Sequence, residues 1–127
     1  MNEIALMKKA FKFLLDRGFC LTQYKNNFEY CVVYHSTKIE IVLDYDLRTH
    51  RFDVGLMNIA NGAKNTYLSV MEVNALDERG RNEVVKKITS IYDEEERKWF
   101  FSKKSLSKII NIYAEFLKQN IDALEFF

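Results

Sequence analysis

Acidic side chains crowd the polar face of two neighbouring predicted strands, and they are the residues whose types and spacing best suit chemistry. Asp44 and Asp46 stand two apart in the alternating run 39–46, so both side chains point to one face of that strand. Glu40 shares this face by parity, and the expected pairing of the next strand places Asp53 opposite Asp44. Like charges so placed repel each other. A divalent cation, nearby basic side chains or a basic protein surface could relieve that repulsion.

The sequence leaves these three ways of balancing the carboxylates open, together with plain solvation of a polar face. Lys38, Arg48 and Arg51 are close enough in the sequence to neutralise the acids. Two or three carboxylate oxygens could equally begin a site for a hard cation. We assign no metal and no cofactor. We instead take four residues as candidates for contact with a protein partner: Glu40, Asp44, Asp46 and Asp53.

A second acidic group lies in the C-terminal third of the chain. It consists of Asp93, Glu94, Glu95 and Glu96. The run could be a solvated helix end, partly paired with Arg97 and Lys98. It could also be a patch that docks a basic surface, because such patches speed association and set specificity. The pattern does not show whether this segment is helical, and its four acids are further candidates for partner contact.

Nucleophilic catalysis needs a nucleophile and a base within hydrogen-bonding reach of each other. Cys31 and His35 are four residues apart on one predicted strand, so their Cα atoms lie about 13 Å apart, which is too far. A phosphate-binding loop needs clustered glycines between a strand and a helix. The four glycines are isolated, at Gly18, Gly55, Gly62 and Gly80. We therefore expect no catalytic residues and no enzyme.

The periodicity of the apolar residues predicts an α+β fold with helices packed on one face of a sheet. An N-terminal helix over 3–17 precedes a four-stranded antiparallel meander, and two C-terminal helices follow. The predicted strands are 28–35, 39–46, 52–56 and 66–73, and the later helices cover 84–92 and 106–121. The last strand leaves an edge that could pair with a second copy of the chain.

The turn between the first two predicted strands sets their register. A short connection at Ser36 and Thr37 pairs His35 with Lys38, and all apolar partners then fall on one face. This register places Glu29 beside Asp44.

Composition limits the class of protein. The chain has 127 residues, 48% of them hydrophobic, a net charge of +1 and two cysteines. This predicts a single domain over 1–127 that has a core of its own and no global attraction to nucleic acid or to an anionic membrane. No apolar run approaches the ~20 residues that a membrane span needs. We expect a cytoplasmic protein with free thiols and neither a membrane nor a nucleic acid as partner.

Four segments in the first half of the chain carry a resemblance to a known class of proteins. They are 11–19 (FKFLLDRGF), 33–36 (VYHS), 39–46 (IEIVLDYD) and 51–54 (RFDV). With the helix–meander layout, they resemble small bacterial immunity proteins of polymorphic toxin and contact-dependent inhibition systems. The resemblance implies stoichiometric neutralisation of a toxin, often a nuclease, whose basic surface the inhibitor covers. It implies no fixed set of binding residues.

The leading hypothesis is therefore an immunity-type protein that occludes a cognate toxin. A phage or mobile-element inhibitor of a host defence enzyme would use the same binding physics. A small-ligand or enzymatic domain with a pocket that the pattern does not reveal is the third alternative.

Overall fold

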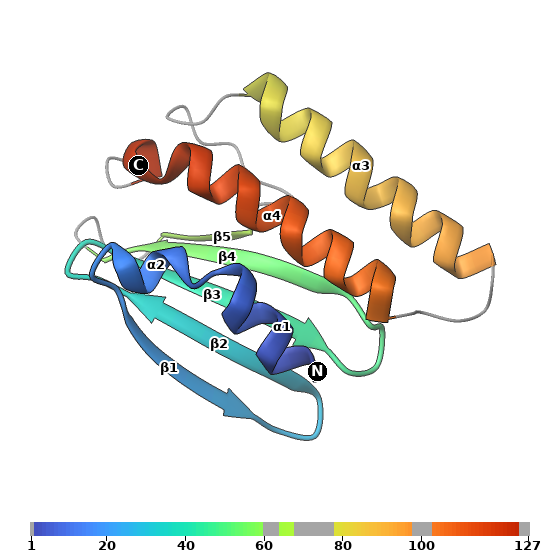
Figure 1. The fold of residues 1–127 in the computed structure, drawn as a ribbon, viewed down its shortest axis with the longest axis horizontal. Helices are drawn as coiled ribbons and strands as arrows, with labels where there is room; N and C mark the ends of the chain where they lie inside the picture. Colours follow the sequence, from blue (N-terminus) through green and yellow to red (C-terminus); the bar gives the residue numbers. More distant parts are fainter. Residues whose placement is uncertain (1, 60–63, 68–77, 98–102, 125–127) are drawn as a thin grey trace.

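The computed structural model describes residues 2–59, 64–67, 78–97 and 103–124. It confirms the predicted α+β layout of an N-terminal helical segment, an antiparallel meander and two C-terminal helices (Figure 1). The elements are α1 (Glu3–Ala10), α2 (Phe13–Asp16), β1 (Cys20–Lys25), β2 (Glu29–His35), β3 (Ile39–Asp46), β4 (Phe52–Asn58), β5 (Lys64–Tyr67), α3 (Glu78–Arg97) and α4 (Lys103–Leu124).

The N-terminal segment begins as predicted but is not one continuous helix. The side chain of Asn2 caps α1 by accepting a hydrogen bond from the N–H of Ala5. At the junction with α2, the N–H of Leu14 donates to the carbonyl of Phe11, three residues back. In such a tight turn the side chains of residues three apart point to the same side. Phe11 and Leu14 therefore both face the core, and both are fully buried. Leu15, which we expected in the same apolar stripe, is 44% exposed.

The sheet contains the predicted strands in the predicted order and one strand more. Its order is β1-β2-β3-β4-β5, with every neighbouring pair antiparallel. The alternating patterns of β2, β3 and β4 predicted these strands correctly, whereas β1 was not predicted. β5 contains the start of the predicted strand 66–73, and positions 68–73 lie outside the described residues.

The predicted register between β2 and β3 is wrong by two residues. His35 pairs with Glu40 rather than with Lys38, and Glu29 therefore lies opposite Asp46 rather than Asp44. The turn forms one position later than expected, because the hydroxyl of Ser36 accepts hydrogen bonds from the N–H groups of the residues at 38 and 39. A shift of two preserves which side chains share a face, so the hydrophobic pattern could not detect it. The predicted pairing of β3 with β4, including Asp44 opposite Asp53, is confirmed.

One face of the sheet forms the core together with the helices. Along β3 every second residue is buried, with Ile39, Ile41 and Leu43 at most 1% exposed. α1 contacts β2 and α4 contacts β4, while α3 lies along α4 (Figure 1). The hydroxyl of Tyr92 ties α3 to the sheet, because it accepts a hydrogen bond of 2.7 Å from the N–H of Phe52. This helical layer leaves the opposite face of β2 and β3 free of helices within the described ranges.

Candidate functional site

The side of the sheet opposite the helices, which we call the outer face, is the face on which the candidate acids of the strands were predicted. Strand alternation and the observed register arrange its central residues in rows across the sheet. One row consists of Tyr24, Cys31, Asp44 and Asp53. The next consists of Thr22, Val33, Val42 and Gly55. The third consists of Cys20, His35, Glu40 and Met57.

A row with two valines thus lies between two rows that carry carboxylates. Val33 and Val42 face each other at the centre, and both are half-buried. Asp44 and Glu40 flank Val42 on the same strand, because they stand two positions to either side of it. The arrangement is an apolar strip with acidic margins.

The tightest side-chain cluster of the outer face surrounds the thiol of Cys31. The Sγ atom of Cys31 donates to Oδ1 of Asp44 over 3.5 Å, and the hydroxyl of Tyr24 donates to the same sulfur. The acidic and thiol groups of Glu29, Cys31 and Asp44 lie within 4.8 Å of one another. Cys31 is only 1% exposed although no helix of the described part covers it, because its neighbours on the sheet surround it.

Burial and like charge shift the acid–base properties of this cluster. Burial, together with the hydrogen bond to Glu29 and the negative charge of Glu29, raises the pKa of Asp44 to about 6. Burial also raises the pKa of the Cys31 thiol to about 12. The thiol is therefore protonated at neutral pH and is a poor nucleophile.

Glu29, Cys31 and Asp44 are also the described residues best placed to hold a metal ion. Two carboxylates and a thiolate can bind a divalent metal of intermediate softness. The metal would first have to displace the proton from a thiol whose pKa is strongly raised. Crowded acids and a buried cysteine also occur in proteins without bound metal, so we assign no ion to this cluster.

Arg48 and Arg51, the nearby arginines, each lie over an aromatic ring. The guanidinium of Arg48 lies 5.0 Å from the ring centroid of Phe28, and that of Arg51 lies 4.6 Å from the ring centroid of Tyr92. The charge of Arg48 helps to lower the pKa of Asp46, but no basic residue is among the main causes of the shift at Asp44. Neutralisation by arginine, one of the alternatives that the sequence left open, therefore applies to Asp46 and not to Asp44.

Asp46 and Asp53, two other predicted sheet acids, accept hydrogen bonds from the turn and from α4. Oδ1 of Asp46 accepts hydrogen bonds from the N–H groups of Arg48 and Thr49, and these bonds lower its pKa while closing the turn after β3. Asp53 accepts a hydrogen bond from the hydroxyl of Tyr113 on α4. Asp46 and Asp53 therefore have hydrogen-bond donors within the fold, and we keep Asp44 and Glu40 as the candidates for partner contact on the outer face.

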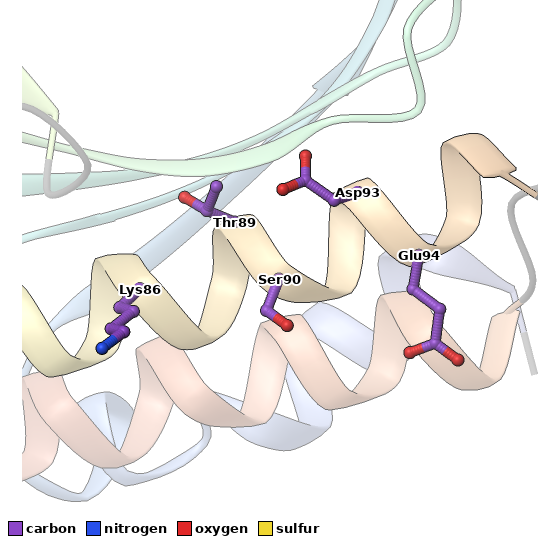
Figure 2. A pocket seen from close by; sticks show the side chains of 5 residues that line it. All are labelled: Lys86, Thr89, Ser90, Asp93 and Glu94. Atoms are coloured by element: carbon purple, nitrogen blue, oxygen red, sulfur yellow. The ribbon is translucent and has the colours of Figure 1, made fainter.

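The acidic run on the last third of the chain is helical, which the sequence left open. α3 extends to Arg97, and Asp93 and Glu94 are exposed on it, whereas the side chains of Glu95 and Glu96 lie outside the described part. Figure 2 shows a surface pocket in which Thr89 and Asp93 project from one side of α3 and Lys86, Ser90 and Glu94 from the other. Successive residues of a helix point about 100° apart. The two described acids of the run, Asp93 and Glu94, therefore point in different directions from α3.

A turn signal before β2 could have predicted the hairpin that places Tyr24 in this site. Asn26 and Asn27 mark a turn, and Oδ1 of Asn26 accepts hydrogen bonds from the N–H groups of Phe28 and Glu29. That turn closes the hairpin of β1 and β2 and brings Tyr24 opposite Cys31.

Comparison with known proteins gives no match. No protein-family model, curated protein or solved structure matches the chain. Among the described residues, no helix is both long and apolar enough to cross a membrane.

Proposed function

We propose that this chain is an immunity-type inhibitor that binds a basic toxin through its outer face and neutralises it by covering it, without performing catalysis itself. The observation that carries the proposal is the acid-flanked apolar strip on the outer face. At one margin of the strip, the half-buried carboxylates of Glu29 and Asp44 lie close together, and no basic side chain is among the main causes of the pKa shift at Asp44.

The crowded carboxylates favour a cationic partner. Their mutual repulsion and partial burial raise the free energy of the ionised cluster. A lysine or arginine side chain of a partner would offset both effects. Opposite charge on two proteins also steers their encounter, so the same residues would speed association.

The apolar strip suits the centre of an interface. Protein interfaces combine a centre depleted in charge with a polar rim. Val33 and Val42 supply the centre, and Glu40 and Asp44 supply the rim. A basic nuclease surface has the complementary character, and its occlusion by a stoichiometric partner would block access of its substrate.

We place this function in the cytoplasm, which is a reducing compartment. Cys20 and Cys31 are free thiols in the structure. Cys20 is exposed at the start of β1, and Cys31 is buried beneath its neighbours.

The experiment combines capture with charge reversal. The tagged chain captures its partner from the native lysate, beside a Glu40→Lys/Asp44→Lys variant whose fold is checked by circular dichroism and thermal melting. We expect a basic protein in one-to-one ratio with the unchanged chain and its loss from the variant. Co-expression should then show that the unchanged chain, but not the variant, restores growth of cells producing the partner.

A matched control reverses two charges at the other acidic region. Asp93→Lys/Glu94→Lys makes the same change in net charge on α3, where the side chains point in different directions. We expect this variant to retain capture and protection. Loss of capture in the α3 variant alone would transfer the binding surface from the sheet to the helix.

A further inference from the structure

β1 forms one edge of the sheet. It pairs with β2 alone and lies at the edge remote from α3 and α4 (Figure 1). Five of its six residues are exposed, and Leu21 is half-buried. Proteins usually protect such edges with charges in mid-strand, prolines or bulges. β1 carries one charge, Lys25, at its very end, its pairing with β2 is continuous, and the chain has no proline.

The register decides which backbone groups of β1 point away from the sheet. The N–H of Asn26 donates to the carbonyl of Glu29, so these two residues face each other as a hydrogen-bonded position of the ladder. In an antiparallel pair such bonds recur at every second residue. Cys20, Thr22 and Tyr24 therefore use their backbone groups toward β2. The N–H and C=O groups of the alternate residues Leu21, Gln23 and Lys25 point outward, and no described residue pairs with them.

We propose that two copies of this chain associate through β1, antiparallel and about a two-fold axis at Gln23, to form one continuous sheet. In this register Gln23 pairs with Gln23 of the second copy, and Leu21 pairs with Lys25. The three residues with outward backbone groups thus pair only with one another. Each of their outward N–H and C=O groups then has a hydrogen-bond partner in the second copy. This closure identifies a second copy, rather than an unrelated strand, as the occupant of the edge.

The side chains agree with this register. Thr22 lies opposite Tyr24 of the second copy, on the outer face, where an aromatic and a β-branched residue make a favourable cross-strand pair. Lys25 lies opposite Leu21, so the two lysines are separated by about four residues along the strand, roughly 13 Å. At that distance physiological salt screens most of their repulsion. A two-fold axis normal to the sheet also leaves both outer faces pointing the same way.

The alternative two-fold axis at Thr22 is less complete. It would pair Lys25 with Phe19 of the second copy. The N–H of Phe19 already donates to the carbonyl of Leu14, and its ring is only 5% exposed. This register would leave Lys25 without its full set of hydrogen bonds.

The first test measures the mass in solution by sedimentation equilibrium, from low micromolar to near-millimolar concentration. We expect the mass to rise from that of one chain to that of two, because a single strand pair is a small interface. A mass that stays at one chain throughout overturns the proposal. Capture of another protein by β1, with no self-association, overturns it as well.

Two variants at one position isolate the backbone bonds. Gln23→Pro removes an N–H that points away from β2, so the fold should be retained. Because the axis passes through this position, the change removes two intermolecular bonds and should raise the dissociation constant at least about tenfold. Gln23→Ala keeps the N–H and should dimerise nearly as well as the unchanged chain. Equal dimerisation of the proline and alanine variants contradicts the proposed edge.

Disulfide trapping tests the register. In a Cys20→Ser/Cys31→Ala background, which removes the native thiol opposite position 24, a mixture of Thr22→Cys and Tyr24→Cys chains should cross-link under mild oxidation, since non-hydrogen-bonded cross-strand pairs lie closest. Thr22→Cys chains alone should stay uncross-linked. Efficient cross-linking of Thr22→Cys chains alone would show the other axis and overturn the register.

Discussion

The two faces of strand β3 differ in what they contribute, although their residues alternate along one segment of chain. Ile39, Ile41 and Leu43 point to the helices and are at most 1% exposed. Val42 and Asp44 point to the outer face and are half-buried. Packing constrains the first set, because interiors are close-packed and tolerate little change in volume. The second set is free of helices in the described part of the chain, so its residue types can serve recognition instead of the fold.

Truncation on the core face should have the largest effect. Leu43→Ala removes a fully buried side chain and leaves a cavity, so we expect the free energy of unfolding to fall by about 2–5 kcal/mol. Val42→Ala, one position away on the outer face, should cost less than about 1 kcal/mol. Urea denaturation measures both. Similar losses for the two variants would show that the outer face is packed as tightly as the core.

Two tyrosines sharpen the comparison within the core. Tyr92→Phe removes the acceptor for the buried N–H of Phe52, and we expect a loss of about 1–3 kcal/mol. Tyr34→Phe should be neutral or slightly stabilising, because its buried hydroxyl has no hydrogen-bond partner among the described residues. Thermal melting of both variants checks this opposite behaviour. A large loss at Tyr34 would show that its hydroxyl is bonded in solution.

The sequence predicted which face of β3 is buried, but it did not predict the register of β2 or the presence of β1. The period of two in 39–46 identified the strand and its buried side, because parity depends only on local alternation. The register of β2 against β3 depends on whether Ser36 caps the turn, which parity does not report. β1 escaped prediction because its side chains are nearly all exposed and show no apolar alternation. The cluster around Cys31 depends on the register of β2 against β3 and on the presence of β1. Its full composition could therefore not be predicted, whereas the position of Asp44 opposite Asp53 could.

The pH dependence of stability tests the crowding at Asp44. Its pKa rises from 3.8 to about 6 on folding, so the folded state holds the proton more tightly than the unfolded chain. The ionised carboxyl therefore lowers stability above pH 6, and this penalty shrinks as the pH falls from 6 toward 3.8. Asp44→Asn should raise the free energy of unfolding at neutral pH by about 1 kcal/mol, with solvent screening of this half-exposed group included, and by less near pH 4.

Asp46→Asn is the matched control for this measurement. Its folded-state pKa is lowered by hydrogen bonds to the turn, so its charge contributes stability that is lost as the pH falls. An asparagine oxygen can still accept the bonds from Arg48 and Thr49. We expect no gain in stability at neutral pH from this variant. A gain equal to that of Asp44→Asn would mean that general charge reduction, and not local crowding, causes the effect.

The rate of association with the captured partner tests the central claim most directly. We expect Glu40→Lys/Asp44→Lys to slow association by about tenfold at low salt, with a difference that shrinks as salt rises, while the stability of the fold changes little. Surface plasmon resonance against the immobilised partner measures these rates for the unchanged chain and for the Asp93→Lys/Glu94→Lys control. Selective slowing of the sheet variant is the predicted result. An unchanged rate and affinity for that variant would contradict the assignment of the outer face as the docking surface.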